Sequence, residues 1–192
     1  NVGTGVRVVA TEKTFTQGSS VQTGNSLDLM IDGRGFFQVL LPDGSTAYTR
    51  DGAFKIDSEG RLVTANGYEV QPSITIPNEV QTLTLATAGQ IQAPLAGQSE
   101  PVPLGTLQVA DFINPAGLQP RGQNLYVETA ASGAPQIGNP DVEGRGSLVQ
   151  GSLEGSNVNV VEELVAMIET QRAYEMNSKA IAASDQMLQY LN

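Results

Sequence analysis

The sequence predicts a mainly β protein: an antiparallel β body with extended stalk strands and one long C-terminal α-helix. The first observation behind this prediction is that Asn-Gly and Asp-Gly dipeptides separate short apolar segments at intervals of about eight residues, a spacing typical of hairpin turns. The second is that apolar residues return at three- and four-residue steps after Val161, with no Gly or Pro among them. The composition agrees, because 21 Gly, 10 Pro and no Trp favour many short strands and turns.

The β-rich body is expected to span residues 27–131. Leu27, Leu29 and Ile31 alternate with residues that would face the other way, and turn dipeptides end the segments that follow, which predicts an antiparallel meander. Strands are expected at residues 35–41, 46–50, 53–57, 61–65, 68–71, 80–86, 90–93, 105–112 and 124–128. Glycine tolerates the positive φ that sharp reversals demand. Structural turns are therefore expected at Gly33, Gly35, Gly44, Gly52 and Gly67.

Stalk strands are expected on both sides of this body, in residues 1–26 and in a segment that returns after it. Residues 132–146 have turn chemistry and little apolar content, including Pro135 and Pro140. Residues 132–157 are therefore predicted to be a linker followed by the returning strand. We expect residues 6–15 to pair with residues 148–153.

The C-terminal residues 158–192 are predicted to form one assembly helix. Asn159 can cap its N-terminus with Glu162 three residues on, and the periodicity predicts about 34 helical residues, or about 50 Å. Apolar residues follow two lines along this helix, which implies more than one neighbouring helix. The chain supplies no second long helix, so the partners are expected from other chains; the alternative is a helix folded back on the sheet. The candidate assembly residues are Val161, Leu164, Val165, Ile168, Tyr174, Met176, Ala180, Ile181, Ala183, Met187 and Leu188.

Composition also limits the chemistry that this chain can perform. Asp and Glu outnumber Lys and Arg by 20 to 10, a net charge of −10 without a basic cluster, which disfavours nucleic acid and anionic membranes as partners. No apolar run approaches a membrane span, and the first residues do not form a signal peptide. The absence of Cys and His removes thiolate ligands, cysteine nucleophiles and the commonest general base. We expect no enzymatic activity, no cofactor, no metal site and no small-molecule substrate.

Two local motifs permit a chemical interpretation beside a structural one. Residues 33–35 (Gly-Arg-Gly) suggest a dinucleotide loop, but Gln38 stands where the third glycine belongs and a strand follows where a helix is required. Asp51, Asp57 and Glu59 suggest a calcium loop or a glycosidase carboxylate pair. Their spacing does not fit a calcium loop, and each lies in or beside a hairpin turn, which favours solvated turn carboxylates.

A set of ungapped motifs runs through most of the chain. The body contains TGNSLD at residues 23–28, IDGRGFFQV at 31–39 and YTRDGAF at 48–54, and the C-terminal region contains SNVNV at 156–160 and QRAYEMNSK at 171–179. In this order they resemble the flagellar rod and hook protein family. NLY at 124–126 and SGAP at 132–135 resemble most the distal-rod branch. The family begins with an N-terminal helix, so we expect this chain, which opens on Asn1, to be truncated and to lack any export signal carried there.

The resemblance implies an axial structural protein of the bacterial flagellum. Its body would lie outside a tubular core of N- and C-terminal helices from many subunits, and the self-assembled helical rod would transmit torque from motor to hook around a type III export channel. It implies as partners other copies of the chain, proximal-rod proteins, the hook protein or hook–rod junction, and the peptidoglycan and outer-membrane ring proteins. The implied location is the basal body, in the rod that crosses the periplasm to the outer membrane, where the protein serves cell motility.

Three alternatives remain at this point. The first is a proximal-rod or hook subunit of the same family. The second is a surface domain that binds carbohydrate, and the third is a hydrolase that uses carboxylates such as Asp51 or Asp57. Glycan binding without polymer formation would favour the second, and activity lost on changing either carboxylate alone would favour the third.

Overall fold

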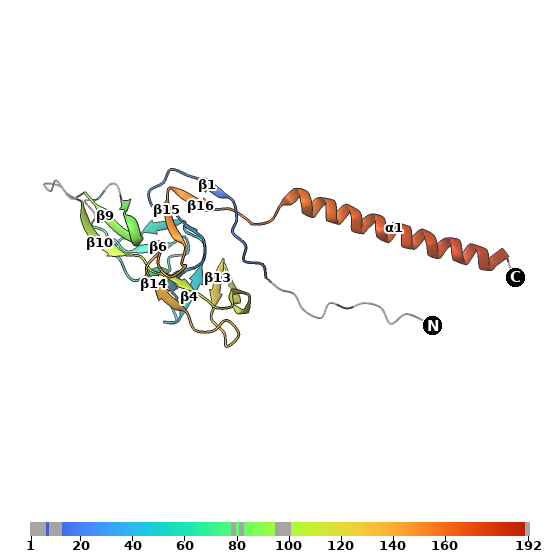
Figure 1. The fold of residues 1–192 in the computed structure, drawn as a ribbon, viewed down its shortest axis with the longest axis horizontal. Coiled ribbons are helices and arrows are strands. Elements are labelled where there is room, and N and C mark those ends of the chain that lie inside the picture. Colours follow the sequence, from blue (N-terminus) through green and yellow to red (C-terminus); the bar gives the residue numbers. More distant parts are fainter. Residues whose placement is uncertain (1–6, 8–12, 78–79, 81–82, 95–100, 191–192) are drawn as a thin grey trace. The chain divides into compact units, whose positions relative to one another are not determined.

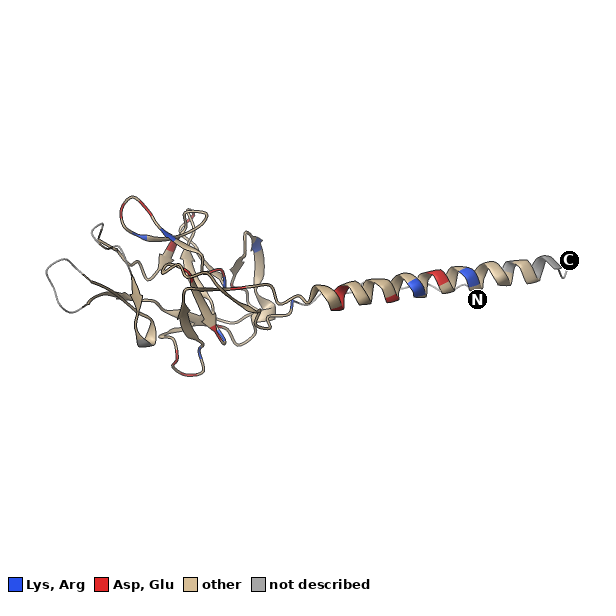
Figure 2. Ribbon diagram, turned by 90° about the horizontal axis from the view of Figure 1, so that it is seen from above, with Lys and Arg blue, Asp and Glu red and all other residues tan. Residues whose placement is uncertain are grey.

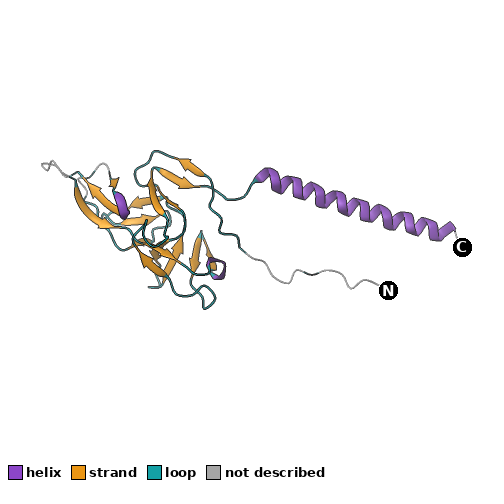
Figure 3. Ribbon diagram, viewed as in Figure 1, coloured by secondary structure: helices purple, strands orange, loops and turns teal. Residues whose placement is uncertain are grey.

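The computed structural model describes residues 7, 13–77, 80, 83–94 and 101–190 (Figure 1). Its strands are short, all strand pairs are antiparallel, and one long α-helix follows them (Figure 3). The predicted fold class is therefore confirmed. The chain divides into two units, residues 1–155 and 156–192, and we call the first unit the body.

The largest sheet of the body has seven strands. Two of its hairpins form where the sequence supplies turn residues. Residues 37–40 pair with residues 46–49 around Pro42-Asp43-Gly44, and Val63 pairs with Glu69 around Asn66-Gly67. In spatial order the strands are β12 (Gln119–Gly122), β13 (Leu125–Val127), β4 (Thr46–Thr49), β3 (Phe37–Leu40), β7 (Glu69–Gln71), β6 (Leu62–Thr64) and β5 (Phe54–Ile56).

This order corrects the prediction of a simple meander. β4 and β5 follow each other in sequence, yet three strands separate them in the sheet, so that Asp51-Gly52 does not close a hairpin. Gly52 does not have a positive φ. A Cβ at this position would overlap the carbonyl oxygen of Leu29, whose N–H donates to the Gly52 carbonyl at 3.1 Å. Glycine is therefore required here by a close approach of two backbone segments and not by a turn.

The described part of the body contains four smaller sheets besides the seven-stranded one. Two 3₁₀ turns, η1 (Thr87–Gly89) and η2 (Pro115–Gly117), lie among them. The expected strand at residues 105–112 is divided between β10 and β11, which belong to different sheets. The sheets are β10 (Val102–Thr106) with β9 (Gln90–Ala93) and β8 (Thr84–Leu85), β11 (Val109–Asp111) with β14 (Gln136–Gly138), β15 (Ser147–Gln150) with β2 (Leu29–Asp32), and β1 (Ser20–Gln22) with β16 (Ser152–Glu154).

The segments flanking residues 27–131 differ from the expected stalk and linker. β14 lies within the predicted linker and β15 begins the predicted returning strand, yet they pair with β11 and β2 of the body. β16 pairs with β1 through Ser20↔Glu154, Val21↔Leu153 and Gln22↔Ser152. The expected partner of residues 148–153, residues 6–15, falls largely outside the described residues, and residues 13–15 form no strand. The returning segment is thus part of the body's hydrogen-bonded network, because β2 offers an open edge to which β15 adds.

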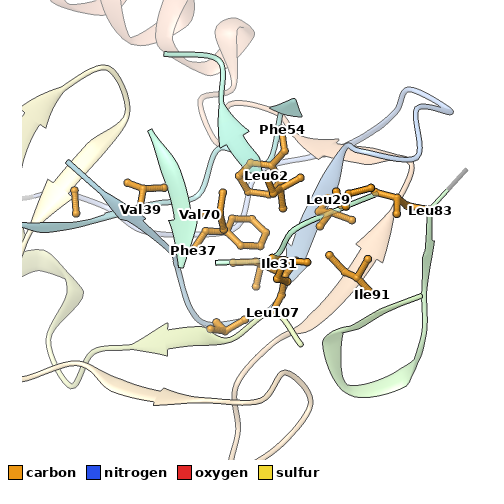
Figure 4. Close-up of a cluster of buried hydrophobic side chains, with 14 of the residues drawn as sticks. Leu29, Ile31, Phe37, Val39, Phe54, Leu62, Val70, Leu83, Ile91 and Leu107 are labelled. Atoms are coloured by element: carbon orange, nitrogen blue, oxygen red, sulfur yellow. The ribbon is translucent and has the colours of Figure 1, made fainter. Parts of the chain in front are cut away.

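Side chains from several of these sheets share one apolar core. Phe37 of β3 and Phe54 of β5 are fully buried and meet edge to face, with ring centroids 5.0 Å apart (Figure 4). Ile31, Leu107 and Ile91 join them from β2, from the segment after β10 and from β9 (Figure 4). A second, aromatic cluster consists of Phe36, Tyr48, Phe112, Ala110 and Leu118, with Phe15 and Tyr126 packed against it.

The second unit consists mainly of α1 (Val160–Tyr190). The side chain of Asn159 accepts a hydrogen bond from the backbone N–H of Val161 at 3.1 Å, which confirms the predicted N-cap. Glu162 and Glu163 lie in the first turn, where the helix dipole favours negative charge. With 31 residues, α1 is about 46 Å long.

Candidate functional site

The side chains of α1 are exposed wherever the structure describes them. Among the large apolar ones the exposed fraction runs from 48% at Ile168 to 77% at Tyr174. Ala180 and Ala183 are exposed too, whereas the side chain of Leu188 lies outside the described residues. The other members of the predicted assembly set in this range are Val161, Leu164, Val165, Met176, Ile181 and Met187.

These apolar residues do not share one face of the helix. At 3.6 residues per turn, Val161, Leu164, Val165 and Ile168 centre on a direction about 80° away from that of Met176, Ala180, Ala183 and Met187. Tyr174 and Ile181 project from a further side. A helix that is apolar on several sides is normally buried among several neighbours. The surface of α1 therefore suits more than one partner helix.

The charges of α1 are interspersed along its length (Figure 2). It carries Arg172 and Lys179 against five acidic residues, so it has no basic stripe of the kind that binds phosphate backbones. Within the described ranges, no helix has the length and apolar character needed to cross a membrane. The acidic residues are Glu162, Glu163, Glu169, Glu175 and Asp185.

The Gly-Arg-Gly segment at residues 33–35 forms the reversal between β2 and β3. Gly33 and Gly35 have φ of +112° and +131°, and a Cβ on Gly35 would overlap the side chain of Val109. The guanidinium of Arg50 donates to the carbonyl oxygens of Gly33 at 2.8 Å and Gly35 at 2.9 Å. This reversal is thus filled by a side chain of the protein itself and leads into a strand, unlike a phosphate-binding loop.

The carboxylates considered for a calcium or hydrolase site are turn residues. Asp57 accepts hydrogen bonds from the backbone N–H groups of Arg61 at 2.8 Å and Glu59 at 2.9 Å, and the Arg61 guanidinium also donates to it. The bond from the Arg61 backbone is the largest cause that lowers the pKa of Asp57. Asp51 accepts from the N–H of Ala53 at 3.1 Å. In the part of the chain that the structure describes, no group of His, Cys, Asp and Glu could hold a metal ion.

The remaining predicted turns show how the hairpins close. Gly44 and Gly67 have φ of +80° and +84°, and an added Cβ would meet no atom within 4 Å at either position. Glycine is therefore favoured at both positions by the backbone conformation, whereas at Gly52 it is required because a side chain would have no space.

Two family models match the chain. Residues 30–93 match the model described as flagellar hook protein FlgE/F/G D1 domain, and residues 149–192 match the model described as flagellar basal body rod FlgEFG protein C-terminal. The first match covers β2 to β9 of the body, and the second covers β16 and α1.

Several relatives that match nearly the whole of this chain carry the name flagellar basal-body rod protein FlgG. That of Buchnera aphidicola subsp. Acyrthosiphon pisum is 53% identical over 191 residues, which covers 100% of this chain and 74% of the relative. That of Borreliella burgdorferi is 49% identical over 193 residues, covering 100% of this chain and 73% of the relative. That of Caulobacter vibrioides is 47% identical over 188 residues, covering 98% and 72%.

A β body followed by one long exposed helix thus coincides with two flagellar family models, as the motifs predicted. The chain belongs to the flagellar rod and hook protein family. Within that family it is a structural subunit of the distal rod, like the FlgG proteins that it matches along its whole length.

Proposed function

We propose that α1 packs against helices of other copies of this chain and so builds a helical, tubular drive shaft. The observation that carries this proposal is a helix of 31 residues with no buried side chain among those described, although it presents Val, Leu, Ile, Met and Tyr on several sides. A helix gains most of its stability from packing rather than from intrinsic propensity. Only partners from outside the second unit can provide this packing.

The rod would carry torque from the motor to the hook and enclose the export channel. The subunits would meet through different surfaces, and such heterologous contacts continue into a helical filament where they do not close into a ring. At its ends the polymer would contact proximal-rod proteins and the hook protein or hook–rod junction. Around it would lie the peptidoglycan and outer-membrane ring proteins, as the rod crosses the periplasm to the outer membrane. The role is mechanical and not enzymatic.

Substitution of an assembly residue by a carboxylate tests this proposal. Leu164→Asp or Ile168→Asp in the full-length protein should abolish rod formation and swimming, because the carboxylate would be desolvated between helices without a partner. The β signal in circular dichroism should remain, since Leu164 and Ile168 lie outside the body's core. Electron microscopy of basal bodies and a swimming assay provide the two measurements.

Leu164→Met provides the matched control. It keeps an apolar side chain of similar volume at the same position of α1, and its cells should form rods and swim. Normal rods in cells that carry Leu164→Asp would refute the assignment of α1 to the assembly interface.

A further inference from the structure

The ribbon of β1 and β16 is the part of the body that continues directly into the helical unit. β16 ends at Glu154, and the second unit begins at Ser156. The ribbon has only three residue pairs, and Ser20, Val21 and Gln22 are all exposed. A two-stranded ribbon of this kind is marginal in water by itself. β16 lies beside β2, and at the far end of the ribbon the N–H of Gly151 donates to the carbonyl of Asp28 at 2.8 Å. The end at Glu154 is therefore the one that a further attachment would secure.

An ion pair of low exposure holds the end of the ribbon nearer to α1 in sequence. Nε of Arg50 donates to Oε2 of Glu154 at 2.8 Å, and these two side chains are only 21% and 11% exposed. Oε1 of Glu154 accepts from the backbone N–H of Gly18 at 2.9 Å, so that both carboxylate oxygens are used. The N–H of Gly155 donates to the carbonyl of Ser19 at 2.7 Å beside this pair.

The same guanidinium reaches the reversal between β2 and β3. Besides the carbonyls of Gly33 and Gly35, Arg50 donates to that of Ile31 at 3.3 Å. Arg50 therefore joins β16 directly to the backbone of the strand that carries Ile31, a fully buried core residue. Truncating one partner of such a pair leaves the other charge in a poorly hydrated place, which is strongly destabilising.

The segment that precedes β1 is held at the same reversal. Gln17 accepts a hydrogen bond from the N–H of Gly33 at 2.9 Å and donates to the carbonyl of Ile31 at 3.2 Å. Two residues earlier, the ring of Phe15 packs edge to face on Phe36, with centroids 5.7 Å apart. The incoming and outgoing segments of the ribbon thus share one attachment point, residues 31–36.

We propose that Arg50, Glu154 and Gln17 form a clamp that fixes both segments of the ribbon to the body at the β2–β3 reversal. Force that enters the body through residues 155–156 then acts on an ion pair anchored to core backbone and does not peel the ribbon apart pair by pair. The load-bearing role rests on the proposed function of α1, whereas the clamp itself is a property of the body. Arg50, Glu154 and Gln17 are positioning residues, and they need not touch another subunit.

Hydrogen exchange on the 192-residue chain tests the clamp without any assembly. In Glu154→Gln, the amides of Gly18, Gly155 and the ribbon should exchange about tenfold faster, while those of β3 and β7 should change less than about twofold. Arg50→Gln should accelerate the same amides, and the double variant should add little, because the two residues act as one unit. Should either variant fail to fold, Gln17→Ala, which leaves the ion pair intact, should still accelerate exchange at Gly33 and in the ribbon.

Arg121→Gln is the matched control. It breaks the ion pair to Asp43 at 3.0 Å, in which both side chains are about half exposed, and it should leave exchange in the ribbon unchanged. Unchanged exchange in the ribbon of Glu154→Gln, or an equal increase in β3, would overturn the clamp.

Cells that carry full-length Glu154→Gln test the load-bearing role separately from assembly. They should form rods, unlike Leu164→Asp cells, but lose swimming speed more steeply than wild-type cells as the viscosity of the medium rises. Wild-type swimming at high viscosity, despite faster exchange in the ribbon, would overturn the load-bearing role while leaving the function of α1 untouched.

Discussion

The body and α1 differ in how far their side chains are buried. The body buries a large apolar core and an aromatic cluster, and no buried side-chain polar atom of the described residues lacks a hydrogen-bond partner. α1 has a capped N-terminus and regular backbone geometry, yet the structure records no buried side chain along its described length. The same chain thus contains one unit with a buried apolar core and one whose described side chains are all exposed.

This difference divides the apolar residues of the sequence into two groups. Residues such as Phe37 and Ile31 pack against other residues of the same chain and stabilise the body. Residues such as Leu164 and Met176 are exposed on α1, and their packing partners must come from outside the second unit. Substitutions should therefore divide into those that unfold the body and those that leave it folded and prevent assembly.

The largest expected effect is a core truncation in the body. Phe37→Ala should lower the free energy of unfolding by about 3–5 kcal/mol, because it removes a fully buried ring that packs on Phe54. Tyr174→Ala, which truncates an exposed ring of α1, should change it by less than about 0.5 kcal/mol. Urea denaturation followed by the β signal measures both. A loss of similar size in the two variants would show that α1 contributes to the stability of the body, and the division into a packed body and an unpacked helix would be wrong.

Local patterns of the sequence predicted much of the fold. Asn66-Gly67 and Asp43-Gly44 close hairpins as expected, and the strand predicted at residues 90–93 coincides with β9. The long helix and its Asn159 cap also follow from residues close together in the chain. Each of these features depends on local conformational preferences, which a single sequence displays directly.

Features that depend on distant residues were not predictable in this way. Asp51-Gly52 has the composition of a hairpin turn, but the backbone of Leu29 passes beside it and three strands separate β4 from β5. Pairing of β15 with β2 joins residues more than a hundred positions apart. The candidate site on α1 was predictable, because its apolar residues recur at helical spacing within one segment. The ion pair between Arg50 and Glu154 was not, because the two residues lie 104 positions apart and neither gives a local signal.

A second effect should appear in the body at alkaline pH. Burial of Tyr48, helped by the nearby charge of Glu128, raises its pKa from 10.0 to about 12. The folded body therefore keeps this proton more tightly than the unfolded chain does, so that the stabilisation is complete below pH 10 and is lost as the pH rises to about 12. The loss should reach at most roughly 2–3 kcal/mol.

Denaturation of the body between pH 9 and 12 measures this loss. Tyr48→Phe keeps the edge-to-face contact with Phe112 but has no titrating hydroxyl, so its stability should fall less over the same range. Equal slopes for the two proteins would show that Tyr48 ionises as freely in the folded body as in the unfolded chain.

The smallest expected effect isolates backbone conformation from packing, and it concerns Gly67. Its φ of +84° lies in the left-handed region, its N–H donates to the carbonyl of Thr64 at 2.9 Å, and nothing lies within 4 Å of an added Cβ. Gly67→Val should therefore cost about 1 kcal/mol or somewhat more through strain alone, because β-branched residues rarely adopt this conformation. Gly67→Asn, a residue that tolerates positive φ, should cost clearly less in the same urea denaturation. Equal stability of the two variants would show that strain at this positive φ does not decide the cost of losing the glycine, and the conformational explanation of Gly67 would be wrong.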